Sequence, residues 1–168
     1  MTVIELLIAG LVFLICMLGV VPLFMIAIGN NGRGKVDTTS TELAQSVIEQ
    51  ITAVLARGGP SAMTDCGATQ TTWAISTQPT PSGSVPLSGS GIDFNAAKVD
   101  GYHMDFVVCG DAPTANAVYD VRWRIDPMST STVYTTYLVT VSAKPQALPQ
   151  KRFAFSLPVT LRTYVGKQ

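Results

Sequence analysis

Charged side chains are scarce in this sequence, and no basic cluster stands out. Asp, Glu, Lys and Arg make up 13% of the 168 residues, and the 11 basic side chains are balanced by 11 acidic ones. A protein that binds nucleic acid needs a basic patch or stripe to neutralise phosphates, whereas the lysines and arginines here are scattered. The composition therefore gives no support for nucleic acid as a partner.

Motifs for catalysis and metal binding are missing as well. The single histidine, His103, has Asp100 and Asp105 nearby, but strand alternation puts only His103 and Asp105 on one face, without a further ligand. The sequence contains no Gly-x-Ser-x-Gly, Cys-x-x-Cys or His-Glu-x-x-His motif, and the Gly-rich segment before Val36 lacks the spacing of a phosphate-binding loop. We predict neither an enzyme nor a protein with a cofactor or a bound metal.

What the sequence does contain is a long apolar run at its start. Residues 6–28 are 23 positions without a charge, and about 20 residues suffice for a helix to cross the hydrocarbon of a bilayer. A cleaved secretory signal would need a basic flank, a shorter apolar stretch and a small-residue cleavage site, which are not found here. A lipoprotein signal would need small residues before Cys16, where Leu14 and Ile15 stand.

Glu5 is the one charge at the edge of this run. An acid placed in a membrane segment is costly and is usually functional, with a partner that can be named. Alternatively, Glu5 lies in the headgroup region at the start of the helix, where the positive end of the helix dipole favours it. The residue types alone leave both interpretations open.

The start Thr2-Val3-Ile4-Glu5-Leu6-Leu7-Ile8, followed by Gly19 and Pro22, resembles the mature N-terminus of type IV pilins and the related pseudopilins. The resemblance covers about the first fifty residues. It implies a helix that is stored in the inner membrane and then packed into a filament core. It also implies that Glu5 pairs with the N-terminal amine of a neighbouring subunit, and that the helix loosens around Gly19 and Pro22.

The resemblance bears on topology too. Arg33 and Lys35 follow the apolar run, and the positive-inside rule alone would place the rest of the chain in the cytoplasm. The pilin resemblance implies instead that a short basic leader has been removed by a prepilin peptidase. Met1 would then carry the methylated amine of the mature protein. The alternative is that Met1 is the initiator and that nothing was cut.

A strong helix breaker follows the apolar run in residues 29–36. The segment contains Gly29, Asn30, Asn31, Gly32 and Gly34, and we expect the helix to break here whatever happens at Pro22. After a cap at one of the Thr or Ser residues 38–41, residues 37–57 repeat apolar positions at helical spacing until Gly-Gly-Pro ends the pattern. We predict an amphipathic helix whose apolar face packs on a sheet.

The remaining residues, 58–168, are predicted to form a β-rich head. A Ser/Thr/Gly/Pro-rich connection spans residues 60–98 and includes a possible short strand at Trp73-Ala74-Ile75. Four β-branched and aromatic stretches follow, at residues 102–109, 118–125, 133–143 and 153–165, and they indicate an antiparallel meander. In the second stretch, apolar residues alternate with Asp120, Arg122 and Arg124, which predicts one buried and one solvated face. The fold class is α+β.

Three cysteines allow one internal pair in the head. Cys16 lies in the apolar run, which leaves Cys66 and Cys109. We predict a disulfide between them, formed in an oxidising compartment, although two unrelated thiols are the alternative.

Two classes of function remain. The first is a structural subunit, a major or minor pilin, of an extracellular filament built from copies of this chain. The resemblance implies the pilus assembly machinery as a further partner and the inner membrane as the reservoir. The second is a pseudopilin of a type II secretion-like machine, or a membrane-anchored binding domain that faces outward.

Overall fold

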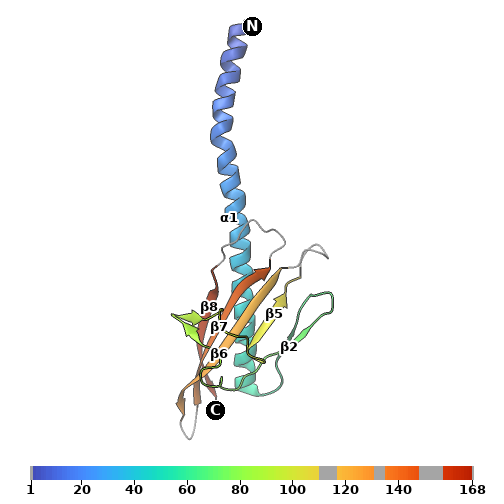
Figure 1. Ribbon diagram of the computed structural model, residues 1–168, viewed down its shortest axis with the longest axis vertical. Helices are drawn as coiled ribbons and strands as arrows, with labels where there is room; N and C mark the ends of the chain where they lie inside the picture. The colour runs from blue at the N-terminus through green and yellow to red at the C-terminus, as the bar shows by residue number, and fades with distance from the viewer. Residues whose placement is uncertain (1, 110–116, 131–134, 148–156, 168) are drawn as a thin grey trace. The chain divides into compact units, whose positions relative to one another are not determined.

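The computed structural model describes residues 2–109, 117–130, 135–147 and 157–167 (Figure 1). Met1 and the predicted strand residues 133–134 and 153–156 lie outside the described residues. The chain divides into two compact units, Met1–Lys35 and Val36–Gln168, and we call the second unit the body. One helix, α1 (Val3–Arg57), contributes to both units, and all strands belong to the body.

The helix α1 ends where the sequence predicts. Gly58 and Gly59 follow Arg57 with φ angles of 73° and 114°, which residues with a Cβ rarely adopt. The Gly58 N–H donates to the Val54 carbonyl at 2.7 Å and so satisfies one of the last carbonyls of the helix.

The predicted helix break at Gly29, Asn30, Asn31, Gly32 and Gly34 is wrong. These residues are helical, so the predicted helices 1–28 and 37–57 are parts of one helix, which also includes Pro22. A glycine within a helix costs only about 1 kcal/mol relative to alanine and keeps its backbone hydrogen bonds. Because helix propagation needs no new nucleus, the helical sequences on both sides extend through the weak segment.

The hydroxyl residues that could have capped a second helix lie inside α1 instead. Ser40 Oγ donates to the Val36 carbonyl at 3.0 Å, and Thr41 Oγ1 donates to the Asp37 carbonyl at 2.8 Å. Such bonds to the preceding turn satisfy Ser and Thr within a helix, so a run of these residues does not require a helix start.

The body contains the predicted four-stranded antiparallel meander, with neighbouring strands in sequence order. The bounds of its strands are β5 (His103–Val107), β6 (Val118–Thr130), β7 (Thr135–Ala147) and β8 (Val159–Lys167). Two small antiparallel pairs precede it in the chain. They are β1 (Ala62–Thr64) with β2 (Thr72–Ala74), and β3 (Leu87–Ser88) with β4 (Gly91–Ile92). A long helix followed by antiparallel strands agrees with the α+β class.

One face of the sheet packs against the part of α1 that lies in the body, as predicted (Figure 1). Val47 and Ile51 of α1 are fully buried, and so are Val121, Trp123 and Val141 of the sheet. These side chains share one apolar core, to which the alternation along β6 and β7 contributes every second residue.

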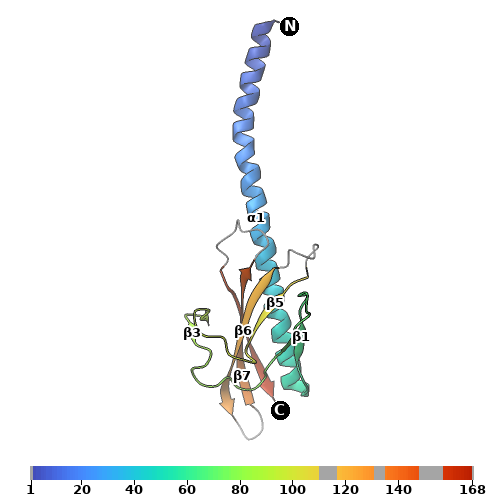
Figure 2. The same cartoon turned by 45° about the vertical axis from the view of Figure 1, so that its right-hand side comes forward.

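The opposite face of the sheet is covered, which corrects the prediction that it is solvated. Asp120 and Arg122, on this second face of β6, are only 7% and 5% exposed. Figure 2 shows why: the sheet lies between α1 and the connection that carries β3. Val85 and Ile92 of that connection are buried, and the Ile92 N–H donates to Ser142 Oγ of β7 at 3.4 Å. Residues 85–96 of the connection therefore form a second layer over this face of the sheet.

Candidate functional site

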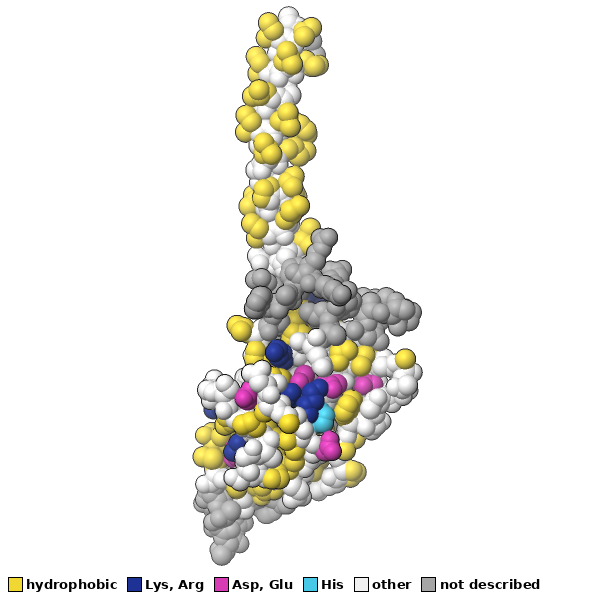
Figure 3. All heavy atoms as spheres, viewed as in Figure 1, with side chains coloured by type: hydrophobic (Ala, Val, Ile, Leu, Met, Phe, Trp, Pro, Cys, Tyr) yellow, Lys and Arg dark blue, Asp and Glu magenta, His cyan; other side chains and the backbone are white. Residues whose placement is uncertain are grey.

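The N-terminal part of α1 shows apolar side chains on every side. From Val3 to Ile28, its large hydrophobic residues are between 44% (Val20) and 78% (Val3) exposed in the single chain. Figure 3 agrees with this for the side that faces the viewer, where hydrophobic side chains cover this stretch and no charged side chain is visible on it. By length and composition, the helix is long and apolar enough to cross a membrane.

Glu5 has a partner within its own chain. The Thr2 N–H donates to Glu5 Oε2 at 2.8 Å, and the Leu6 N–H donates to the Thr2 carbonyl at 3.3 Å. Thr2-x-x-Glu5 thus has the spacing of a capping box, in which an acid in the first turn binds the N–H of the residue before the helix. In the isolated chain, Glu5 stabilises the start of α1, which agrees with the helix-start interpretation of this residue.

The structure says less about the other residues that the resemblance assigns to assembly, which are Met1, Gly19 and Pro22. Met1, whose amine the resemblance pairs with a neighbouring Glu5, lies outside the described residues. Gly19 and Pro22 lie within α1, and the helix shows no interruption around them. A Cβ placed on Gly19 would meet nothing within 4 Å.

The predicted disulfide between Cys66 and Cys109 is present, with a Cα–Cα distance of 5.0 Å. It joins the loop between β1 and β2 to the end of β5, where the Cys66 N–H also donates to the Val107 carbonyl at 2.9 Å. Cys16 is a free, exposed thiol on α1.

Asp65, beside this disulfide, organises the loop between β1 and β2. Its carboxylate accepts hydrogen bonds from the Gly67 and Thr71 N–H groups and from Trp73 Nε1, at 2.9 to 3.1 Å, and the residue is only 4% exposed. Sequence reasoning missed this role, although Asp followed two residues later by Gly is a typical turn signal.

A buried ion pair holds the connection against the second face of the sheet. Arg122 Nε and Nη2 donate to the Asp120 carboxylate at 2.9 to 3.2 Å. Arg122 Nη1 and Nη2 also donate to the carbonyls of Asp93, Phe94 and Ala96, at 2.8 to 3.3 Å. The guanidinium group therefore bridges β6 and the connection, a role that the alternating sequence pattern did not predict.

Two further cations complete this charged cluster. Lys98 Nζ pairs with Asp105 and lies 3.9 Å from Asp120, and Lys144 Nζ lies 5.7 Å from the centre of the Phe94 ring. Figure 3 shows the resulting group of acidic, basic and His side chains in the middle of the body. Opposite charges pair within this cluster, so it does not form a field of one sign that would attract a charged ligand.

Burial and neighbouring charges change two further ionisable groups. Burial raises the pKa of Tyr119 above its usual value; a hydrogen bond with Thr39 acts in the opposite direction, and the negative charge of Asp37 adds to the increase. Hydrogen bonds to Asp126 raise the pKa of Arg124, which therefore stays charged.

His103 is held by structural contacts. Its Nδ1 lies 2.8 Å from the Val99 carbonyl, and its ring packs edge-on against Trp73 with the ring centres 6.1 Å apart. Within the described part of the chain, no three His, Cys, Asp or Glu residues are grouped so that they could hold a metal ion.

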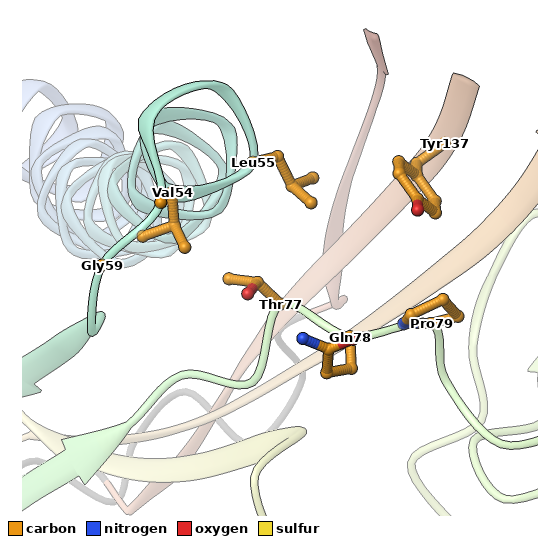
Figure 4. A pocket seen from close by; sticks show the side chains of 8 residues that line it. Val54, Leu55, Gly59, Thr77, Gln78, Pro79 and Tyr137 are labelled. Atoms are coloured by element: carbon orange, nitrogen blue, oxygen red, sulfur yellow. The ribbon is translucent and has the colours of Figure 1, made fainter. Parts of the chain in front are cut away.

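A small pocket of about 170 Å³ lies where α1 ends in the body (Figure 4). Its lining residues come from the end of α1, the connection and β7: Val54, Leu55, Gly58, Gly59, Thr77, Gln78, Pro79 and Tyr137. None of them is a carboxylate, a histidine, a cysteine or a basic residue, and a catalytic site usually needs at least one such group. The pocket therefore carries no functional assignment.

The chain was compared with protein families, with curated proteins and with solved structures, and none of them matches it.

Proposed function

We propose that this protein is the structural subunit, a major or minor pilin, of an extracellular type IV pilus-like filament. The observation that carries the proposal is the N-terminal part of α1, where large apolar side chains are exposed on all sides of the helix. Such a surface needs lipid or other apolar helices around it. A bilayer supplies the first environment before assembly, and packed helices of neighbouring subunits supply the second.

Glu5 gives this proposal its specific chemistry. In a filament core without water, a carboxylate needs a cation, because an unpaired buried charge is very unfavourable. The N-terminal amine of a neighbouring copy is the cation that the pilin resemblance assigns. Glu5 then exchanges its bond to the Thr2 N–H for an ion pair between subunits, and this pair sets the register of otherwise uniform apolar helices.

The second candidate is a pseudopilin of a type II secretion-like machine, or a membrane-anchored domain that faces outward. The body agrees with this candidate, because Val36–Gln168 has its own core and its own disulfide. Such a protein would use the same helix in the bilayer without forming long filaments. We rank the pilin candidate first because Glu5, Gly19 and Pro22 all stand where the resemblance to type IV pilins places such residues.

Two substitutions of Glu5 separate its capping role from its proposed role in assembly. Glu5→Gln keeps an oxygen that can accept the Thr2 N–H but removes the charge, whereas Glu5→Ala removes both. We expect both variants to accumulate in the membrane and to lose at least about 90% of their incorporation into sheared surface filaments. A lost buried ion pair costs a few kcal/mol, and about 1.4 kcal/mol already corresponds to a factor of ten.

Glu42→Gln is the matched control, because Glu42 is an exposed acid on the same helix within the body. It should incorporate normally. Normal incorporation of Glu5→Gln would show that Glu5 acts only as a cap. A wild-type chain that never leaves the membrane would contradict the filament function itself and would favour the second candidate.

A further inference from the structure

Residues 29–35 are the weakest helical segment of α1. Three of them are glycines and two are asparagines, and both residue types are poor helix formers. The segment is nevertheless helical throughout, so its local preference and its observed state disagree. A helix that exists against its local preference opens at a lower free energy than its neighbours.

Packing does not compensate for this weakness at the asparagines. The side chains of Asn30 and Asn31 are exposed. In contrast, Val47 and Ile51 of the same helix are fully buried in the core of the body. Most helical stability in proteins comes from such packing, so packing stabilises the part of α1 around Val47 and Ile51 more than the turn that contains Asn30 and Asn31.

The position of the segment along the chain decides whether it can open. The 23 residues from 6 to 28 rise about 34 Å as a helix, which matches a hydrocarbon layer of roughly 30 Å. Pro22 then lies within the lipid, where freed backbone groups find no partner and opening is unfavourable. Residues 29–35 follow at the water boundary, where water can bind each N–H and C=O that the helix releases.

We propose that residues 29–35 form a hinge in α1 that opens reversibly at the membrane surface while residues 6–28 remain helical. The location of the hinge at the membrane surface rests on the proposed function, in which residues 6–28 cross the bilayer. The low stability of the helix there rests on the glycine and asparagine residues themselves. Reversible opening lets the body change its orientation on the span without any change in either folded part. This freedom would serve the proposed transfer of the subunit from the bilayer into the filament.

Hydrogen exchange on the full chain in phospholipid nanodiscs tests the hinge. We expect backbone amides of residues 29–35 to exchange at least about 100-fold faster than those of residues 43–55, because local opening is much cheaper than unfolding of the body. The triple substitution Gly29→Ala, Gly32→Ala and Gly34→Ala should slow exchange of the segment by roughly 100-fold, at about fivefold for each alanine. A Cβ at Gly34 meets nothing within 4 Å, so alanine fits there without a clash.

The double substitution Gly10→Ala, Gly19→Ala is the matched control. Both glycines lie within residues 6–28 of the same helix, and a Cβ at either also meets nothing within 4 Å. This variant should leave exchange of residues 29–35 unchanged. Equal protection of residues 29–35 and 43–55, or unchanged exchange in the triple variant, would overturn the hinge. If the proposed filament function is wrong, the Glu5 incorporation assay will show it, and the exchange rates of residues 29–35 will still test the hinge.

Discussion

At the scale of single residues, Arg122 shows how the body tolerates a buried charge. Its guanidinium group donates to the Asp120 carboxylate and to three carbonyls of the connection, so neither charged group is buried without a partner. Replacing both residues by apolar ones could be nearly neutral, but removing one leaves the other charge unpaired. Removing either member of this buried pair alone should therefore destabilise the body far more than removing an exposed charge.

We predict that Arg122→Ala lowers the free energy of unfolding of the body by about 3–5 kcal/mol. Urea unfolding of the full chain in detergent measures this, with the fluorescence of Trp73 and Trp123 as a signal that comes from the body alone. Arg162→Ala is the control, because Arg162 is exposed on β8, and it should change stability by no more than about 0.5 kcal/mol. Equal effects of the two substitutions would contradict the role of Arg122.

Tyr119 predicts a pH dependence at alkaline pH. Because its pKa is raised in the folded state, the folded chain holds the phenolic proton more tightly than the unfolded chain does. Stability is therefore complete below the unfolded pKa near 10.0 and falls as the pH rises through the higher folded pKa. Tyr119→Phe should lose this part of the decrease above about pH 10 in the same urea assay.

The exposed Tyr164 provides the comparison, because Tyr164→Phe removes a phenol that is 68% exposed. This variant should keep the alkaline decrease of the wild type. If the two Phe variants behave alike above pH 10, burial of Tyr119 is not the cause.

At the scale of elements, the sequence predicted which elements exist better than where they end. Prediction stopped the second and third main strands at Ile125 and Ala143, before Pro127 and Pro145, but β6 and β7 continue past both prolines. The reason is topological. Along the described pairings, β5 begins at His103, opposite Arg122, and β8 begins at Val159, opposite Ala143. Each proline therefore occupies a stretch of its strand without a second neighbouring strand. Proline is tolerated there, because no ladder needs its N–H on that side.

Two other differences between prediction and structure arise from interactions beyond the local sequence. One involves partners that are remote in sequence, and the other involves cooperativity along a helix. The alternation in β6 correctly predicts its two faces, but it cannot show that carbonyls some 26 to 29 residues away cover Arg122. The glycine-rich segment predicts a break from local preference, whereas helix propagation from both sides carries α1 through it.

The disulfide is the prediction to test at this scale, since it joins the β1–β2 loop to the end of β5. Alkylation of the denatured, non-reduced chain should modify one thiol, Cys16, and alkylation after reduction should modify all 3 cysteines. The double variant Cys66→Ala, Cys109→Ala should lose about 2–4 kcal/mol of stability, because the bridge closes a long loop in the unfolded chain.

Cys16→Ala controls for the loss of a thiol as such and should leave the stability of the body unchanged. Mass spectrometry that finds three modified cysteines without reduction would exclude the bridge.

At the scale of the whole molecule, the two units require different surroundings. The body buries its own apolar side chains between α1, the sheet and the connection, whereas the apolar side chains of the N-terminal unit stay exposed in the single chain. This contrast could be predicted from the sequence, because residues 6–28 are apolar throughout, whereas apolar and polar residues alternate in the strand of residues 118–125. The capping bond between Thr2 and Glu5 could also have been predicted from the Thr-x-x-Glu spacing.

Cryo-electron microscopy of sheared surface material from the cells that produce this protein tests the proposed filament function. We expect filaments whose repeating subunit has the sequence of this chain. We also expect N-terminal helices packed together in the filament core, with each Glu5 carboxylate in contact with the N-terminal amine of a neighbouring subunit. Filaments that lack this chain, or a chain recovered only as a monomer in the membrane fraction, would contradict the proposed function.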